Sequence, residues 1–100
     1  RVAFLARRAG LIVWEEAFLD RGYCDDGTLV ARSERGALLT TVEDVLAGME
    51  RLRGGRGISS VSGKVLRLRP QTLCIHSDTP HAVRLARAVA DLMRENSKRL

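Results

Sequence analysis

Thr72-Leu73-Cys74-Ile75-His76-Ser77-Asp78-Thr79-Pro80 is the stretch of sequence that decides the fold. It begins with a short apolar run, residues 73–75, which is typical of a strand buried on both faces. Polar residues start abruptly at His76, and apolar residues then recur at helical spacing over residues 81–95. Parallel α/β sheets carry their functional groups at the carboxyl ends of such strands. The stretch therefore predicts an α/β fold with a site at the end of this strand.

The helix that follows has a predicted start. Thr79 or Asp78 can cap it through a side-chain oxygen, and Pro80 suits its first turn because a missing N–H costs nothing there. His81 then falls in the first turn of the helix, where we expect its side chain to be exposed.

The length and composition of the chain allow one domain at most. Its 100 residues are 45% hydrophobic, which excludes a chain that is disordered by composition and permits a modest core. No apolar run approaches the roughly 18 residues that span a bilayer, and no signal peptide is recognisable. Cys74 lies in the apolar strand and Cys24 in a polar loop, so no disulfide framework is predicted. We therefore expect a cytoplasmic protein with no membrane partner.

The chain is basic, with a formal net charge of +5 from 17 Lys and Arg against 12 Asp and Glu. A basic chain raises the question of nucleic-acid binding. Here the arginines are spread over several predicted elements, and aromatic residues, at 4%, are too few for a base-stacking surface. We expect a solvated surface charge and no nucleic-acid partner, with any such binding weak and lost on adding salt.

The amino-terminal part of the chain predicts a helix end, a strand and a long loop. Gly10 suits the left-handed position after a short helix. Residues 11–14, Leu-Ile-Val-Trp, are a second apolar run, which we expect to form a strand parallel to residues 72–75. Residues 16–32 show no regular period and predict a loop with a turn at residues 25–27. A loop of this length is uncommon unless it carries function.

The middle of the chain predicts a helix and a hairpin. Thr40 or Thr41 can cap a helix over residues 42–53. Residues 58–61 and 64–68 then predict the two strands of a β-hairpin joined by a two-residue turn. This alternation of helices and strands is that of an α/β domain.

Two parts of the chain resemble the motifs of a known family. The first part is similar to the pattern E-x-F-A-D-R-x-Y…D-G-x-L-v-x-R, and the second to C-v-H-G-D-x-x-x-A-v. The pattern belongs to the LamB/YcsF family, whose bacterial members include the A subunit of the ATP-dependent 5-oxoprolinase. The helix and hairpin between the motifs also match, so the resemblance covers nearly the whole chain. The matching residues are Glu16-Ala17-Phe18-Leu19-Asp20-Arg21-Gly22-Tyr23, then Asp26-Gly27-Thr28-Leu29-Val30 with Arg32, and Cys74-Ile75-His76-Ser77-Asp78-Thr79-Pro80-His81-Ala82-Val83.

The resemblance implies a fold and an activity. The fold is a distorted (β/α) barrel with a small β-hairpin insertion. Residues 1–100 would be a single partial domain, the carboxyl-terminal part, because the family's amino-terminal motifs have no counterpart here and a barrel needs about 250 residues. The activity is ATP-dependent hydrolysis of the 5-oxoproline lactam to L-glutamate. The implied cofactor is ATP, and the implied partners are 5-oxoproline, other 5-oxoprolinase subunits and the missing amino-terminal part of the barrel.

Two residues depart from the family pattern. Leu19 stands where the family has a small Ala, and Ser77 stands where it has Gly. A glycine between His and Asp would permit a tight backbone or a close approach of substrate, because it has no Cβ.

His76 and Asp78 are the predicted catalytic residues. An imidazole at a strand end can act as a general acid or base near neutral pH, and the alternative is a structural histidine satisfied by local backbone. Asp78 either orients the ring of His76 or caps the following helix. No metal site is predicted, because two histidines without a ligand-spaced cluster of Cys or carboxylates fall short of a ligand set.

Five residues of the first motif region are predicted to bind substrate. Arg21 can hold a carboxylate or phosphate with its planar guanidinium, or pair with Asp20 and order the loop. Tyr23 either hydrogen-bonds substrate or packs the loop. Glu16 is a polar residue close behind the expected strand, and Arg32 binds substrate or lies on the surface.

A second functional hypothesis comes from a different class: a non-catalytic remnant or docking module of a LamB/YcsF-like protein. The two hypotheses are separated by whether the parent gene encodes the amino-terminal motifs upstream of Arg1. If residues 1–100 are part of a barrel, the isolated segment should expose an apolar face or associate, since sheet edges and helix faces are left uncovered.

Overall fold

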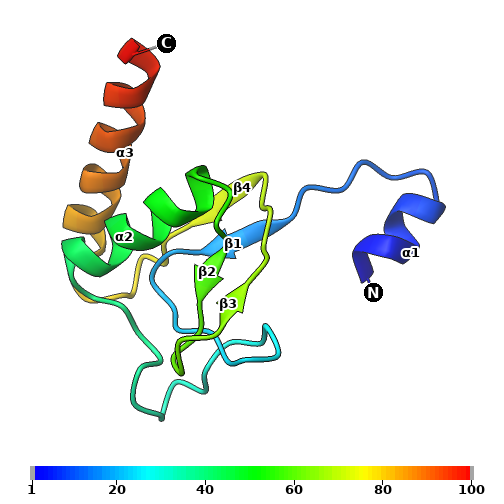
Figure 1. Cartoon of the computed structure of the whole chain (residues 1–100), viewed down its shortest axis with the longest axis horizontal. Coiled ribbons are helices and arrows are strands. Elements are labelled where there is room, and N and C mark those ends of the chain that lie inside the picture. Colours follow the sequence, from blue (N-terminus) through cyan, green and yellow to red (C-terminus); the bar gives the residue numbers. More distant parts are fainter. Residues whose placement is uncertain (1, 100) are drawn as a thin grey trace.

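The computed structural model describes residues 2–99, and the side chains of residues 2–95, as a mixed α/β fold (Figure 1). Within these residues the order of helices and strands is the predicted α/β order. The elements are α1 (Val2–Arg8), β1 (Glu16–Phe18), α2 (Val42–Arg53), β2 (Ile58–Ser59), β3 (Val65–Leu66), β4 (Thr72–Cys74) and α3 (Ala82–Arg99).

The centre of the fold is the parallel pair of β1 and β4. In this pair Glu16 lies opposite Thr72, and Phe18 lies opposite Cys74. The ladder continues past the strand ends, because the Leu19 N–H donates to the Cys74 carbonyl at 3.0 Å. The predicted strand in the 72–80 stretch is confirmed, and its pairing is parallel as predicted, although with another segment of the chain. β4 is half-buried and not buried on both faces, because the described residues give it only one neighbouring strand.

The partner of β4 is not the predicted one. Residues 11–14 do not form a strand but connect α1 to the rest of the fold, and Ile12 is 90% exposed. The strand lies at Glu16–Phe18, inside the segment predicted to be a loop. Ala17 and Leu19, on its inner face, are both buried. Burial of alternate side chains against a partner, and not a continuous apolar run, decides where this strand forms.

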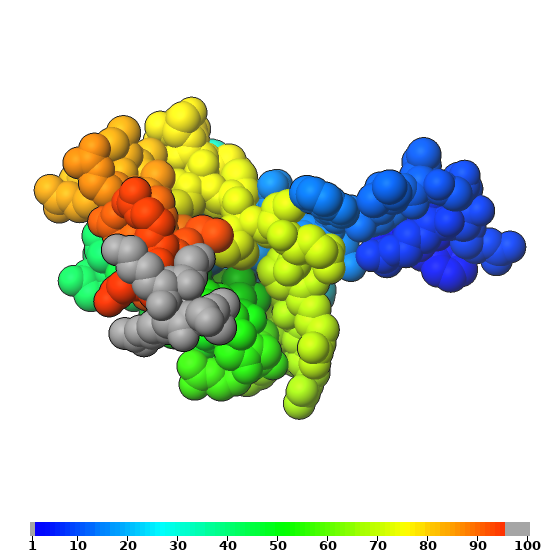
Figure 2. All heavy atoms as spheres, turned by 90° about the horizontal axis from the view of Figure 1, so that it is seen from above, coloured from blue at the N-terminus to red at the C-terminus, as the bar shows by residue number. Residues whose placement is uncertain are grey.

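The segment before β1 projects from the body of the molecule. Figure 2 shows α1 and the connection after it, in dark blue, standing apart from the other elements. As predicted, Gly10 adopts a positive φ, 86°, at the end of the short helix. An ion pair between Arg7 and Glu15, 3.1 Å, links α1 to the residue before β1. Exposed apolar side chains on this projection are Val2, Phe4, Leu5, Leu11, Ile12 and Trp14.

The core lies between β1 and the two long helices. α2 and α3 pack against each other beside the sheet (Figure 1). Full burial of each apolar side chain of this size contributes about 1.5–3 kcal/mol. Leu19, which departs from the family's Ala, is fully buried in this core. The core residues are Leu19, Val45, Met49, Leu85 and Val89.

α2 and the hairpin follow the predictions closely. Thr41 caps α2, since its Oγ1 accepts a hydrogen bond of 3.2 Å from the Asp44 N–H. β2 and β3 pair antiparallel, which confirms the hairpin. The predicted two-residue turn is one residue too short, because Ser60 donates its N–H to the Lys64 carbonyl and encloses three residues. Gly63, the last of the three, has φ 92°, as in a hairpin loop that ends in a left-handed residue.

The start of α3 differs from the prediction. The helix begins at Ala82, so Pro80 lies in the preceding turn and not in the first helical turn. The predicted side-chain caps are wrong. The Ala82 N–H bonds to the backbone carbonyl of Thr79, while the Thr79 hydroxyl and the Asp78 carboxylate have other partners. His81 has φ 63° and is the one described non-glycine residue with a positive φ.

Alanine substitutions at Gly22 and Gly48 are expected to change the free energy of unfolding in opposite directions. A Cβ on Gly22 would lie 2.0 Å from the Gly36 carbonyl oxygen, whereas on Gly48, inside α2, the nearest atom is Ile58 Cδ1 at 3.8 Å. Urea denaturation of the longest natural polypeptide that contains this chain should show that Gly22→Ala lowers the free energy of unfolding by about 1–3 kcal/mol. Gly48→Ala should raise it by about 0.5–1 kcal/mol. Equal stability of the two variants would contradict the close backbone approach at Gly22.

Candidate active site

Asp20 and His76 meet at the carboxyl edge of the parallel pair. Phe18 lies opposite Cys74 at the strand ends, and each candidate follows its strand end by two residues. Because the pairing is parallel and in register, the two side chains emerge next to each other. This is the edge of an α/β sheet at which functional groups gather.

The carboxylate of Asp20 is fully buried and accepts three hydrogen bonds. Its Oδ2 accepts from the His76 backbone N–H at 2.6 Å and from the Thr79 hydroxyl at 2.7 Å. Its Oδ1 lies 3.0 Å from Nδ1 of the His76 ring. One carboxylate thus holds both the main chain and the side chain of His76.

The pKa of Asp20 is shifted below its ordinary value of 3.8. Burial of the carboxylate raises the pKa. Hydrogen bonds from the His76 backbone, the Thr79 hydroxyl and the His76 ring lower it, and together they outweigh the effect of burial. Asp20 is therefore an anion at neutral pH and can only accept. Nδ1 of His76 must then carry the hydrogen in this contact, which leaves Nε2 as the nitrogen with the free lone pair in the neutral ring.

The His76 ring is held yet accessible. The Phe18 ring meets it edge-on, with the ring centroids 4.9 Å apart and the planes at 69°. The side chain of His76 remains 28% exposed. A ring that is oriented on one side by a carboxylate and reachable on the other can accept and donate a proton. Acid–base chemistry is what this arrangement can support.

Asp78 does not perform either predicted task. Its carboxylate lies 3.4 Å from the Arg32 guanidinium, and both side chains are more than half exposed. Asp20, and not Asp78, contacts the His76 ring, because the in-register pairing aligns residue 20 with residue 76. An exposed ion pair of this kind contributes about 0–1 kcal/mol. It does bring the loop of Arg32 to the edge of the site.

Arg21 and Tyr23 hold the loop after β1 together. The buried Arg21 donates from Nε to the Ala37 carbonyl at 3.1 Å and from Nη2 to the Val30 carbonyl at 2.9 Å. The predicted alternative, an Asp20–Arg21 pair, is wrong, since each side chain has other partners. The buried Tyr23 hydroxyl accepts from the Phe18 N–H at 3.0 Å. Both side chains support the loop around the site and stay directed at backbone groups.

Glu16 lies at the amino-terminal end of the β1–β4 pair, whereas His76 lies past its carboxyl end. It is the first residue of β1, and the Thr72 hydroxyl donates to its Oε2 at 3.3 Å. The prediction placed Glu16 after a strand that ended at residue 14. Since the strand begins at Glu16 instead, the structure brings Asp20 to the site in its place.

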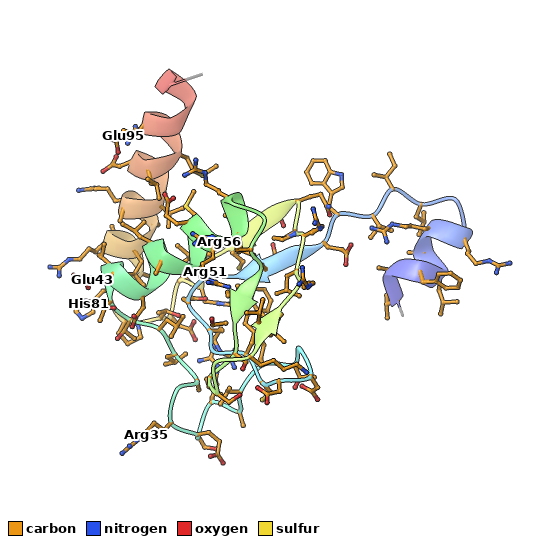
Figure 3. The ribbon with its side chains drawn as sticks, viewed as in Figure 1. Arg35, Glu43, Arg51, Arg56, His81 and Glu95 are labelled. Atoms are coloured by element: carbon orange, nitrogen blue, oxygen red, sulfur yellow. The ribbon has the colours of Figure 1, made fainter. Side chains whose placement is uncertain are left out.

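Two other motif residues lie outside the contact network of Asp20. Ser77 is exposed and its φ is not positive, so this backbone does not need the family's glycine at that position. His81 is exposed, as predicted, and Figure 3 shows it beside Glu43 at the outer edge of α2. Thr79 is the functional candidate that sequence reasoning missed, because its hydroxyl was assigned to a helix cap.

The pH dependence of protein stability tests whether Asp20 is a buried, hydrogen-bonded carboxylate. Because the pKa of Asp20 is lowered in the folded protein, the native state binds fewer protons at this group than the unfolded state does. The contribution of Asp20 to the free energy of unfolding is therefore complete above the unfolded-state pKa and is lost as the pH falls through the folded-state pKa. We expect the stability difference between wild type and Asp20→Asn to be largest at neutral pH and to shrink below about pH 4. Urea denaturation at pH 7, 5 and 3 measures it. A difference that does not change with pH would contradict the assignment.

The described residues bear on two kinds of feature: a group of metal-ligating side chains and a membrane-spanning helix. Among residues 2–95 no group of three or more His, Cys, Asp and Glu side chains is arranged to hold a metal ion. None of the helices, over the part of the chain that the structure describes, combines the length and the apolar character needed to cross a membrane.

The fold and the site define an α/β protein with a carboxylate-held histidine at its sheet edge. The sequence profile of the LamB/YcsF family matches residues 1–100. The chain belongs to the LamB/YcsF family, as its two motifs predicted.

Named relatives and a solved structure agree with this family. The A subunit of 5-oxoprolinase from Nitrobacter winogradskyi is 38% identical over 96 residues, which cover 96% of this chain and 38% of that protein. The A subunit of 5-oxoprolinase from Rhodopseudomonas palustris is 42% identical over 86 residues, covering 86% and 34% of the two chains. The crystal structure of a lactam utilization protein from Thermus thermophilus matches with a TM-score of 0.80 and 35% identity, over 92% of this chain and 36% of that one. The chain thus spans little more than a third of these proteins.

Proposed function

We propose that this chain is the carboxyl-terminal part of an enzyme similar to the A subunit of 5-oxoprolinase, in which His76 transfers protons during opening of the 5-oxoproline lactam to L-glutamate. The observation that carries the proposal is the Asp20–His76 contact at the carboxyl edge of the parallel pair, 3.0 Å between Oδ1 and Nδ1. The family membership and the names of the relatives supply the substrate class.

Lactam hydrolysis needs two proton movements that suit a single imidazole. The attacking water must lose a proton, and the ring nitrogen that leaves the carbonyl carbon must gain one. Nε2 of His76 can take the first proton and deliver it to the second position, because Nδ1 is held by Asp20. The edge-on Phe18 ring limits the other orientations that the imidazole can adopt.

ATP is implied by the resemblance, and the described residues around His76 do not fit it. The place for phosphates would be the turn between β4 and the start of α3. That turn contains no glycine, and the exposed carboxylate of Asp78 would repel a polyphosphate. In our proposal ATP is bound elsewhere in the complete complex, and this chain contributes the proton-transfer group.

The remainder of a distorted (β/α) barrel and other 5-oxoprolinase subunits are the proposed protein partners. An apolar groove of about 530 Å³ runs between β4 and α3, with Leu73, Ile75 and Val89 in its lining. The projecting apolar residues of α1 and its connection are likewise uncovered. Both features support a partial domain whose neighbours lie outside residues 1–100. The two free thiols, Cys24 and Cys74, agree with the reducing cytosol as its setting.

The test is turnover by the parent protein. Its longest natural polypeptide, purified with the neighbouring subunits, should release glutamate from 5-oxoproline in a reaction that requires ATP. The alternative, a non-catalytic docking module, is supported by the uncovered apolar projection and predicts tight binding to the partner subunits with no glutamate release. Absence of the amino-terminal motifs from the parent gene would also favour the docking module.

A further inference from the structure

The buried carboxylate of Asp20 is more than a partner for one ring. Three donors converge on it, and two of them, the backbone N–H and Nδ1, belong to the same residue, His76. A buried anion is destabilising unless it is hydrogen-bonded, and these three donors supply the hydrogen bonds that Asp20 needs. Its arrangement sets the position of His76 at the main chain and at the ring together.

Thr79 controls how the carboxylate is turned. Its hydroxyl, 2.7 Å from Oδ2, and the His76 N–H, 2.6 Å from the same oxygen, approach Oδ2 from two residues of one turn. Two donors on Oδ2 favour this orientation of the carboxylate, in which Nδ1 of His76 lies 3.0 Å from Oδ1 and 3.3 Å from Oδ2. Oδ1 is then left directed at Nδ1 of His76. Thr79 is buried, so water does not compete for this contact.

We infer that Asp20 and Thr79 are a positioning pair that holds His76 in the tautomer with hydrogen on Nδ1 and makes Nε2 its proton-transferring atom. Neither residue touches the reacting atoms; both act through the His76 ring. Thr79 has no other assigned task, since the start of α3 uses the backbone carbonyl of Thr79 and not its hydroxyl. The effect on catalysis rests on the proposed function, but the tautomer itself is a property of the folded protein.

The experiment measures the tautomer directly. Nitrogen-15 NMR of histidine-labelled parent protein, under conditions in which the imidazole is neutral, separates a protonated ring nitrogen from an unprotonated one by a large chemical-shift difference. We expect wild-type His76 to show a protonated Nδ1 and an unprotonated Nε2. Thr79→Val keeps the shape of the side chain and removes the donor, and should give a mixture of the two tautomers. Thr79→Ser keeps the hydroxyl and should restore the wild-type pattern.

Kinetics with the partner subunits gives the second readout. Thr79→Val should lower kcat about tenfold with little change in KM, because it misorients the proton-transferring group without removing it. Asp20→Asn should lower kcat by about 10²–10⁴-fold, since an amide favours the other tautomer. A wild-type His76 with hydrogen on Nε2 would overturn the inference, as would a Thr79→Val protein that keeps both the tautomer and kcat of the wild type.

The outcomes separate this inference from the proposed function. If the tautomer is as expected in wild type and mixed in Thr79→Val, but no glutamate is formed from 5-oxoproline, the positioning pair stands and the proposed substrate is wrong. Should Thr79→Val fail to fold, Thr79→Ala, which also removes the hydroxyl, takes its place, and a wild-type tautomer with wild-type kcat in that variant overturns the role of Thr79.

Discussion

Replacing His76 with Gln is expected to lower kcat for glutamate release about 10²–10⁴-fold, the usual contribution of a positioned acid or base. The substitution is to be made in the longest natural polypeptide, with the partner subunits present. His76 is the one described titratable ring at the carboxyl edge of β4, and its Nε2 is left free by the contact between Nδ1 and Asp20. Glutamine is similar in size but cannot take up a proton, so the loss isolates proton transfer.

The control for this experiment is Asp78→Asn, a residue of the same turn. Asp78 pairs with Arg32 at the surface, 3.4 Å apart, so we expect a much smaller loss of kcat than at His76. Thermal melts of Asp78→Asn should stay close to wild type, because that carboxylate is exposed. His76→Gln should melt somewhat lower, because the ring donor to the buried Asp20 carboxylate is lost, but should stay folded at the assay temperature. Near-normal turnover by His76→Gln, or a loss explained by unfolding alone, would show that His76 is structural.

Leu19→Ala is expected to destabilise the protein by about 2–5 kcal/mol, even though it restores the residue of the family pattern. Leu19 is fully buried among Val45, Met49 and Leu85, and truncation would leave a cavity that these neighbours cannot close completely. The measurement is urea denaturation of the parent protein, monitored by circular dichroism.

Val83→Ala is the matched control for the core substitution. Val83 lies on α3 with 74% of its surface exposed, and its truncation should change the free energy of unfolding by less than about 0.5 kcal/mol. A loss of under about 1 kcal/mol for Leu19→Ala would mean that the core can repack around alanine. The family's smaller residue would then be interchangeable with Leu19 here.

Sequence patterns predicted the parts of the fold that depend on local signals. α2 begins after Thr41 and ends at Arg53 as its cap and period indicated, and the hairpin was wrong by one turn residue. Local signals could not predict that residues 16–18 form the strand that pairs with β4. The inner face of β1 consists of one small residue, Ala17, followed by Leu19 past the strand end, whereas the more apolar run at residues 11–14 is largely exposed.

The misplaced strand explains most of what sequence reasoning missed at the site. Placing the strand at residues 11–14 put Glu16 at its carboxyl end and left Asp20 in a loop. Once β1 is placed at Glu16–Phe18, the parallel register alone brings Asp20 to His76. His76 itself was predicted correctly as the residue at the strand end, and its catalytic role stays a prediction. The role of Thr79 could be recognised only once Asp20, the acceptor of its hydroxyl, was placed beside His76.

The in-register pairing of β1 and β4 also has a consequence for the folding pathway. Asp20 and His76 are 56 residues apart in sequence, and closing a loop of that length costs roughly 3–4 kcal/mol of chain entropy before any contact offsets it. α2 and the β2–β3 hairpin need only neighbouring residues and can form within microseconds. The Asp20–His76 contact is therefore assembled late, and during synthesis it cannot exist until the segment containing Thr79 has left the ribosome. Any slow folding phase in the parent protein should end with the appearance of activity.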